Sequence, residues 1–422
     1  MRVAVVGAGW AGLAAAVRAT QAGHAVTVFE MAAQTGGRAR GVDVDGLALD
    51  NGQHILIGAY ARTLALMSTV GADAGALLHR QSLELRYPDG RGLRMPAGPA
   101  WLAFGLGVMR CRGFGWHDKL ALMRAAAGWA LSGFRCAPGT TVQQLCAGLP
   151  PAVRQLLIDP LSVAALNTGA AEASGAVLLR VLRDALFGGR GAADLLLPRR
   201  PLSALLPQPA VAWLQRTGAT LRLGARVQAV NPAPSGWGVD GEAFDAVVLA
   251  CSAAEAARLS APIAPAWSAR ALALGYEPIV TVYLRCPGAR LPAPMTALIE
   301  GPRAPAQFAF DHGALGATPD LFAFVISGAR SWVDAGLEAT AAAVLEQART
   351  AFPAGTWPAP LSVVRTMAEK RATFRCVPGL DRPPTVIAPG LFAAGDYIEG
   401  PYPATLEGAV RAGETAAAQL SR

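Results

Sequence analysis

Glycines near the N-terminus have a spacing that suits a bound phosphate group. An apolar run at residues 3–6 is followed by the motif Gly-x-Gly-x-x-Gly, and a second apolar run at residues 25–29 ends at Glu30. This order predicts a strand, a tight turn, a helix and a second strand, as in the βαβ unit that binds dinucleotides, with Glu30 on a ribose. The alternative interpretation is a glycine-rich turn that packs the helix closely and binds no ligand. The residues expected at the pyrophosphate are Gly7, Gly9, Trp10, Ala11 and Gly12.

Two further groups of residues indicate which dinucleotide is bound. A Gly-Gly-Arg segment shortly after Glu30 offers a close backbone approach and a guanidinium group for phosphate. Near the C-terminus, a buried strand should end in a Gly-Asp pair that holds a ribityl hydroxyl group, and the helix start that follows would direct N–H groups at a flavin ring. Both ends of the chain therefore predict one site for FAD. Its assigned residues are Gly37, Arg38, Gly395, Asp396, Ala404 and Thr405.

These motifs together resemble those of the flavin amine oxidase and phytoene desaturase superfamily. Within it, the segments at residues 50–55, 160–161, 165–168 and 402–410 are similar to those of hydroxysqualene dehydroxylases. The resemblance implies an α/β fold with a Rossmann-type, amine-oxidase-like FAD-binding domain and a discontinuous α+β substrate domain. It also implies the positions of further cofactor residues, with Val227 beside the adenine and the turn near the flavin. The residues of that turn are Gly52, Gln53 and His54.

Each expected domain is assembled from separate segments. The FAD-binding domain would comprise residues 1–80, 206–265 and 385–422. The substrate domain would comprise residues 81–205, which should be mainly helical, and residues 266–384, which should form a sheet. Residues 221–250 are expected to belong to the FAD-binding domain. The alternative is that they form a β-meander that does not contact the ligand. The predicted elements are a hairpin at 83–90, three strands within 221–250, strands at 279–284, 307–310 and 321–326, a helix at 335–352, and a strand at 362–365 leading to a turn at 369–374.

The composition favours an enzyme that handles an apolar ligand. The chain has 422 residues, enough for two cores, and 53% of them are hydrophobic while only 16% are charged. The mean hydropathy is +0.34. This low charge suggests an apolar ligand, an apolar face, or both. No apolar run reaches the length of about 18 residues that a membrane-spanning helix requires.

The net charge of +8 raises the question of an anionic partner. The basic residues are scattered, which disfavours nucleic acid. Anionic lipid is the better candidate, because aromatic and basic residues lie near one another in one segment. In the alternative interpretation, these residues form a helix pair whose apolar face is core. The segment contains Trp101, Phe104, Phe114, Trp116 and Trp129 together with Arg110, Arg112, Lys119 and Arg124.

The six cysteines predict neither a metal site nor a redox pair. None has the C-x-x-C spacing, and no histidine pair lies near them. No cysteine occurs between Gly395 and Thr405, so FAD should be bound noncovalently. The N-terminus lacks a cleavage region, and we expect a cytoplasmic location, at the inner face of the membrane if the aromatic segment binds lipid.

The family resemblance also implies a reaction. It is the reductive removal of the allylic hydroxyl group of hydroxysqualene, a C30 isoprenoid alcohol, to give squalene, with hydride from reduced flavin N5. The chain has no second dinucleotide motif, so electrons would come from transiently bound NAD(P)H, a partner protein or a quinone. Isoprenoid synthases are candidate partners. Amine oxidases often have a lysine where this chain has Thr281, which argues against amine oxidation.

A general acid should protonate the departing hydroxyl group. His54 is one candidate, although it could instead only contact the flavin. The pair Asp311 and His312 is a second candidate. An exposed turn without a role in the reaction would explain these two residues equally well. Tyr402 would line the flavin face or belong to the core. The alternative functions are a carotenoid-type FAD desaturase and, more remotely, a nonenzymatic isoprenoid-binding protein.

Overall fold

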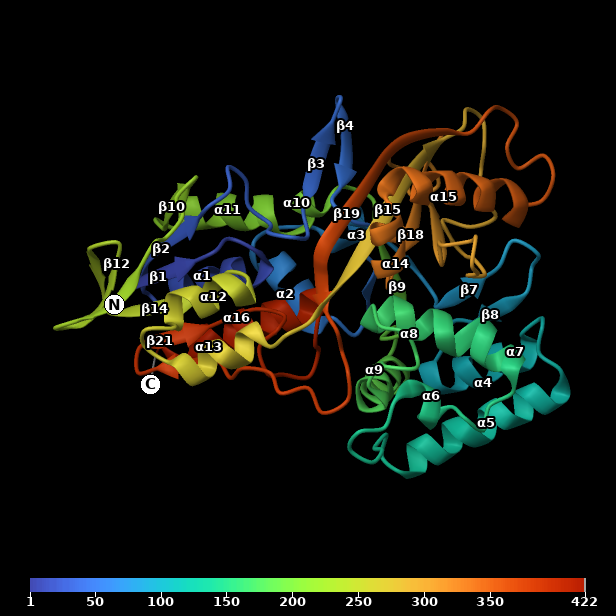
Figure 1. Cartoon of the computed structure of the whole chain (residues 1–422), viewed down its shortest axis with the longest axis horizontal. Coiled ribbons are helices and arrows are strands. Elements are labelled where there is room, and N and C mark those ends of the chain that lie inside the picture. Colours follow the sequence, from blue (N-terminus) through green and yellow to red (C-terminus); the bar gives the residue numbers. More distant parts are fainter. Residues whose placement is uncertain (421–422) are drawn as a thin grey trace.

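A six-stranded sheet at one end of the molecule gathers strands from three distant stretches of the chain (Figure 1). In this computed structural model, which describes residues 1–420, all neighbouring pairs of the sheet are parallel except the last. We call it the parallel sheet. Its order is β10 (Thr220–Leu223), β2 (Ala25–Glu30), β1 (Arg2–Val6), β14 (Ala246–Leu249), β21 (Leu391–Ala393) and β20 (Val386–Ala388).

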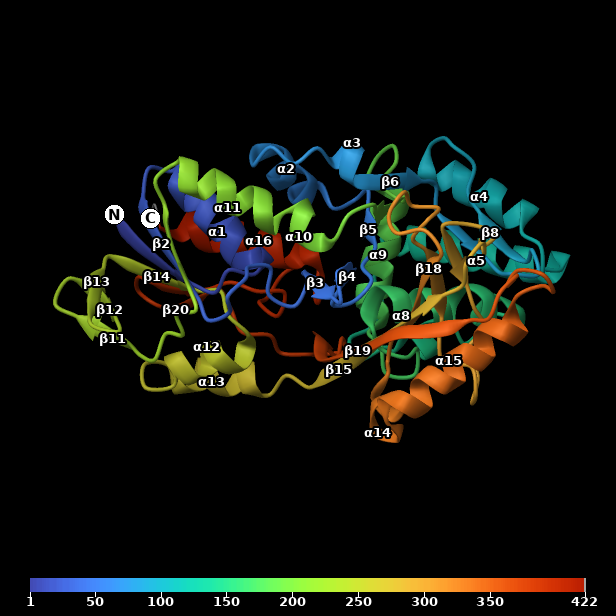
Figure 2. The ribbon, with the colours of Figure 1, turned by 90° about the horizontal axis from the view of Figure 1, so that it is seen from above.

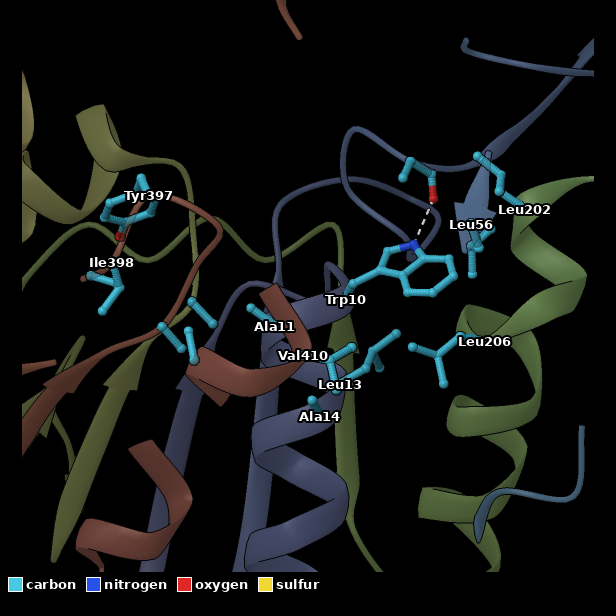
Figure 3. Packing of buried hydrophobic residues seen from close by; sticks show 14 of the residues in the cluster. Trp10, Ala11, Leu13, Ala14, Leu56, Leu202, Leu206, Tyr397, Ile398 and Val410 are labelled. Atoms are coloured by element: carbon cyan, nitrogen blue, oxygen red, sulfur yellow. Dashed lines mark hydrogen bonds between the residues drawn. The ribbon is translucent and has the colours of Figure 1, made fainter. Parts of the chain in front are cut away.

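Helices cover both faces of the parallel sheet. Figure 2 shows α1, α11 and α16 on one side and α12 and α13 on the other. The first and last of the long helices touch closely, because a Cβ on Gly413 would lie 2.1 Å from the oxygen of Ala11. In Figure 3, Val410 packs beside Leu13 in this contact. The bounds are α1 (Trp10–Gln21), α11 (Pro207–Arg216), α12 (Ala253–Ser260), α13 (Pro265–Leu272) and α16 (Leu406–Gln419).

A five-stranded antiparallel sheet forms the second part of the molecule. Its order is β16 (Met295–Ala297), β17 (Phe308–Asp311), β18 (Leu321–Ile326), β15 (Tyr276–Arg285) and β19 (Ser362–Phe374). Side chains alternate between the faces of a strand. Val280 and Val282 therefore pack in the core beneath α15 (Leu337–Ala351), whereas Tyr283 joins the core shared with the parallel sheet.

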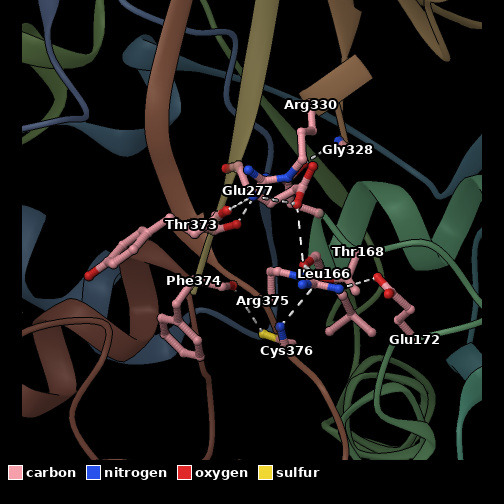
Figure 4. A network of polar contacts seen from close by, with 12 residues as sticks. Leu166, Thr168, Glu172, Glu277, Gly328, Arg330, Thr373, Phe374, Arg375 and Cys376 are labelled. Carbon is pink, nitrogen blue, oxygen red and sulfur yellow. Dashed lines mark hydrogen bonds and ion pairs between the residues drawn. The ribbon is translucent and has the colours of Figure 1, made fainter. Parts of the chain in front are cut away.

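A layer of helices completes this second part. Asn167, in a left-handed conformation at φ 46°, ends α8 and ties the layer to the antiparallel sheet. Its side-chain amide donates to the oxygen of Glu277 and to Thr373 Oγ1 and accepts from the N–H of Gly328. These three partners belong to the polar network labelled in Figure 4. The helices are α4 (Ala100–Arg110), α5 (Trp116–Leu131), α6 (Val142–Leu145), α7 (Pro151–Val153), the π-helix η1 (Arg154–Ile158), α8 (Asp159–Leu166) and α9 (Gly175–Phe187).

Short elements connect the two parts. A three-stranded sheet places β9 between β5 and β6, and so joins the first stretch of the chain to the end of the helical layer. The remaining elements are β3 (Gly41–Val44), β4 (Leu47–Asp50), β5 (Leu56–Ile57), α2 (Ala61–Thr69), α3 (Ala74–Leu77), β6 (Leu78–Gln81), β9 (Leu195–Pro198), α10 (Leu202–Leu205) and α14 (Arg330–Ala335).

Several predicted elements are confirmed, and three differ from the structure. The expected hairpin is β7 (Glu84–Arg86) with β8 (Gly92–Arg94), and the strand at 321–326 has the predicted bounds. The turn predicted at 369–374 is wrong, because this segment continues β19 and pairs with β15. Its charged side chains suggested a turn, but charges are common on an edge strand. The helix predicted at 335–352 begins only after Gly336, whose φ of +99° separates α14 from α15.

The prediction of three strands within residues 221–250 is also wrong. Five strands occupy this stretch, because β10 ends near Gly224, at φ +68°, and remains in the parallel sheet. The next three form an antiparallel meander, and β14 then returns to pair with β1. The meander strands are β11 (Val230–Ala233), β12 (Gly236–Val239) and β13 (Glu242–Phe244).

Candidate active site

The glycine motif turns tightly between β1 and α1. Gly7 has φ +108°, and an added Cβ would lie 2.6 Å from the oxygen of Ala250. A Cβ on Gly12 would lie 1.9 Å from the oxygen of Gly7, so the turn itself requires both glycines. Gly9 differs, since its Cβ would meet only Gly37 Cα, at 3.8 Å. The middle glycine therefore leaves open space where a pyrophosphate could approach the backbone.

Glu30 lies at the carboxyl end of β2, beside this turn. Its side chain is 8% exposed, and its two oxygens accept hydrogen bonds from the N–H groups of Ala8, at 2.8 Å, and Ala32, at 2.9 Å. Val227 is buried nearby on the segment that follows β10, where the N–H of Ala225 donates to the oxygen of Glu30. The structure thus brings together the residues predicted to hold the ribose and the adenine.

Trp10 and Ala11 are buried in the first turn of α1. The indole N–H of Trp10 donates to the oxygen of Ala39 at 2.9 Å, as Figure 3 shows. This bond fixes the Gly-Gly-Arg segment beside the glycine turn. Both residues therefore shape the turn through packing.

Arg38 and Asp396 meet directly, although the sequence assigned them to different parts of the cofactor. Arg38 Nη2 lies 2.5 Å from Asp396 Oδ1, and Arg38 Nη1 donates to the backbone oxygens of Arg371 and Ala372 on β19. Asp396 follows Gly395 just after β21, at the carboxyl edge of the parallel sheet. The pair thus joins both sheets at the point where the two parts of the molecule meet.

The turn after β4 lies against the antiparallel sheet. A Cβ on Gly52 would lie 4.0 Å from Thr281 Oγ1 on β15. Thr281 Oγ1 and Gln53 Oε1 are buried without a hydrogen-bond partner among residues 1–420. Nδ1 of His54 lies 2.7 Å from the oxygen of Gly52, and burial, with the charge of Arg38, lowers the pKa of this imidazole.

These unpartnered atoms fit a polar ring system. The hydroxyl group of Tyr397, next to Asp396, is likewise buried without a partner among the described residues. Buried polar groups are nearly always hydrogen-bonded, so these three atoms have hydrogen-bonding capacity left for a bound group. The open space at Gly9 and these atoms together fit a flavin nucleotide that extends from the glycine turn to Thr281.

The last helix begins beside this region. Thr405 Oγ1 caps α16 by accepting the N–H of Gly408 at 2.9 Å, and Ala404 has φ +57° and donates its N–H to the oxygen of Asp396. Tyr402 packs edge-on against Tyr60, with ring centroids 6.3 Å apart. Burial, with the nearby carboxylate of Asp184, raises the pKa of Tyr402 to about 12. Tyr402 is therefore a weak proton donor.

Asp311 and His312 lie at the end of β17, and they are not exposed turn residues. Asp311 is fully buried, and its carboxylate accepts the N–H groups of Leu291, at 3.1 Å, and Ala314, at 2.9 Å. The ring of His312 packs edge-on against Tyr283, and burial lowers its pKa to about 4. The exposed-turn explanation is thus wrong, and Asp311 holds two loops in place.

Sequence reasoning missed Asp50 as a candidate acid. Its carboxyl group is 6% exposed and accepts the N–H of Leu202 at 2.7 Å, and its backbone oxygen accepts the hydroxyl group of Tyr283 at 3.0 Å. Burial raises the pKa of Asp50 to about 7. An available signal was an acidic residue at the end of a strand, two positions before Gly52.

Among residues 1–420, no cluster of three histidine, cysteine, aspartate or glutamate side chains could hold a metal ion. In the same part of the chain, no helix combines the length and the apolar character needed to traverse a membrane.

Comparison with known proteins assigns the fold and site to a class. Residues 10–421 match the family described as flavin containing amine oxidoreductase, so the protein is a flavin-containing oxidoreductase. A solved oxidoreductase from Methanosarcina mazei has the same fold, with a TM-score of 0.76 and 17% identity over 98% of this chain and 99% of that one.

The sequence relatives narrow the class. A hydroxysqualene dehydroxylase from Rhodopseudomonas palustris is 32% identical over 98% of this chain and 97% of its own length. A probable zeta-carotene desaturase from Synechococcus elongatus is 45% identical, but only over 17% of this chain and 15% of its own. The chain belongs to the hydroxysqualene dehydroxylase family.

Proposed function

We propose that this protein is an FAD-dependent dehydroxylase that converts hydroxysqualene to squalene. The observation that carries this proposal is the similarity to the Rhodopseudomonas palustris relative, which extends over nearly the whole of both chains. The similarity to the desaturase is confined to a short segment, which favours the reductive reaction over desaturation. Thr281 supports it further, because it leaves no lysine at the position that the sequence associated with amine oxidation.

The residues that we assign to FAD extend from the glycine turn after β1 to Thr281 on β15. The turn at Gly9 would receive the pyrophosphate, Glu30 the ribose, and Asp396 the ribityl chain, once its carboxylate is shared between Arg38 and the cofactor. Gln53 and Thr281 carry the unpartnered atoms that suit the polar edge of the ring. We propose that the cofactor is held noncovalently.

The reaction breaks one C–O bond and forms one C–H bond, and the hydroxyl oxygen leaves as water. Bound reduced flavin supplies the hydride, and therefore both electrons. The protein must supply one proton and a dry surface. Thr281 and Tyr283 share one face of β15, where Tyr283 belongs to the buried core, so we place the apolar substrate along this face.

We assign the proton to Asp50. A carboxyl group with a pKa of about 7 is partly protonated at neutral pH and suits general acid catalysis. The other candidates are less suited, since both oxygens of Asp311 accept backbone N–H groups and His54 is neutral at pH 7. The proton would reside on the Asp50 oxygen that Leu202 does not occupy.

An anaerobic turnover experiment tests the proposal. The flavin-loaded enzyme is reduced with dithionite and mixed with hydroxysqualene, and the products are identified by mass spectrometry. Squalene is expected, whereas new double bonds in a carotenoid precursor under oxidising conditions would support the desaturase instead. Repeating the reaction with NADPH or NADH in place of dithionite tests a nicotinamide as the transient electron donor.

Variants test the acid. Asp50→Asn should lower turnover by a factor of about 10² or more while retaining FAD. Asp50→Glu should retain part of the wild-type turnover. Wild-type activity should fall as the pH rises through 7, because the carboxyl group loses its proton. If Asp50→Asn keeps full turnover and His54→Gln abolishes it with FAD still bound, the proton comes from His54.

A further inference from the structure

Several large apolar side chains of the helices α4 and α5 are exposed to solvent. Large apolar side chains are more than a third exposed at 16 positions of residues 1–420, and seven of these lie between residues 101 and 131. Such a concentration on two contacting helices exceeds the usual scatter of single residues. We call it the α4–α5 surface. It consists of Trp101, Leu102, Leu106 and Met109 from α4 and Trp116, Leu120 and Leu131 from α5.

Each helix also has a separate face that belongs to the core. On α4, Ala103 and Val108 are buried, and on α5 Leu122 is buried. The exposed residues therefore form a second apolar stripe, which the packing of the helices does not require. The aromatic residues of the segment singled out from the sequence fall on both the buried and the exposed faces. Phe114 is buried in the core, whereas Trp101 is 58% exposed and Trp116 is 75% exposed.

Basic residues predominate in the segment that forms the α4–α5 surface. Residues 100–135 contain five basic side chains and one acidic side chain. That acid, Asp118, caps α5 by accepting the N–H of Gly115 at 2.8 Å. Lys119 Nζ lies 5.4 Å from the ring centroid of Trp116, so a cation stands directly beside an exposed indole. The basic residues are Arg110, Arg112, Lys119, Arg124 and Arg135.

We propose that the α4–α5 surface binds a bilayer that contains anionic lipids, with its tryptophans at the level of the headgroups. Tryptophan suits this level because its ring is both apolar and able to donate a hydrogen bond. The arginines would attract anionic headgroups, which a purely apolar protein partner would not need. Figures 1 and 2 show α4 and α5 at the end of the molecule opposite the parallel sheet, so bound lipid would leave the cofactor region clear. This inference does not depend on the identity of the substrate.

Flotation of the flavin-loaded protein with vesicles tests the proposal. Vesicles of phosphatidylcholine with phosphatidylglycerol should retain the protein, and salt should weaken the binding. The double variant Trp101→Ala/Trp116→Ala should bind at least about tenfold more weakly, because each indole loses much of its apolar burial. Replacing Arg110 and Arg124 with glutamine should cost about fivefold each on anionic vesicles and little on pure phosphatidylcholine.

A matched control uses exposed leucines elsewhere. Leu223, on β10, and Leu272, on α13, are 47% and 63% exposed, and replacing both with alanine should leave vesicle binding unchanged. The proposal is overturned if the wild-type protein does not bind anionic vesicles, or if the tryptophan variant binds as well as wild type. It is also overturned if sedimentation shows that the surface joins two copies of the chain, or if only an isoprenoid synthase binds it. Turnover of detergent-dispersed hydroxysqualene reports separately on the proposed reaction.

Discussion

Replacing Asp50 with asparagine should make the protein more stable at alkaline pH. Asparagine can still accept the N–H of Leu202 but carries no charge. In the unfolded chain, the carboxyl group ionises near its ordinary pKa of 3.8, whereas burial raises the pKa in the folded protein to about 7. Ionisation between these values therefore favours the unfolded state, and the native protein loses stability as the pH rises through this interval.

The size of the effect follows from the same interval. Each pKa unit corresponds to about 1.4 kcal/mol, so the cost of ionising Asp50 reaches about 4 kcal/mol above pH 7. For 422 residues, an unfolding entropy of about 2.1 cal/mol/K per residue converts this cost into about 5 °C in Tm. Below pH 3.8 the two proteins should melt alike, because the carboxyl group is protonated in both states.

Thermal melts of matched flavin-loaded samples across the pH range give the comparison. Asp45→Asn serves as the control, since Asp45 is exposed in the turn between β3 and β4 and its variant should track wild type at every pH. The reasoning is refuted if Asp50→Asn is less stable than wild type at pH 8, or if the difference in Tm does not change with pH.

Substitutions at four further positions test the cofactor site and the helix contact. Gly9→Ala should leave the fold intact but lower FAD occupancy at least about tenfold, because the methyl group enters the space left for the pyrophosphate. Gly12→Ala should lose both fold and flavin, since its Cβ would lie 1.9 Å from a backbone oxygen. Gly413→Ala should lower the Tm, because its Cβ would lie 2.1 Å from a backbone oxygen of α1. Arg38→Ala should cost about 1–2 kcal/mol by leaving Asp396 unpaired, whereas Arg38→Lys should cost less.

Circular dichroism, flavin absorbance and thermal melts measure these outcomes. Normal flavin content in Gly9→Ala would show that the cofactor does not approach this part of the turn. Unchanged stability in Gly413→Ala would show that α1 and α16 can separate without cost. Equal destabilisation by alanine and lysine at position 38 would mean that its geometry matters more than its charge.

Local patterns predicted the first strand, helix and strand well. The order of β1, α1 and β2 follows from apolar runs and glycines within 30 residues, and the structure confirms it. The turn requires Gly7 and Gly12 for steric reasons that depend on near neighbours. Features of this kind are readable from sequence, since the same short segment contains both the signal and its cause.

Other features depended on partners far away in the chain. Segment 369–374 looks like a turn until β15, about 90 residues earlier, provides its hydrogen bonds. Asp50 acquires its raised pKa only through burial in the folded chain, and the hydrogen bond from the distant Leu202 opposes this shift. Nearly all residues of α4 are apolar or glycine. The sequence alone therefore could not separate the core face of this helix from its exposed stripe.

The order of strands in the parallel sheet has a consequence for biosynthesis. The central strand, β1, is translated first, yet its neighbour β14 emerges some 240 residues later, and β21 follows near the end. While the chain is being synthesised, the edge of β1 that later pairs with β14 is therefore unpaired, and an unpaired strand edge promotes aggregation. The cofactor site that we propose becomes complete only when the late segment with Asp396 and α16 has joined β1 and α1.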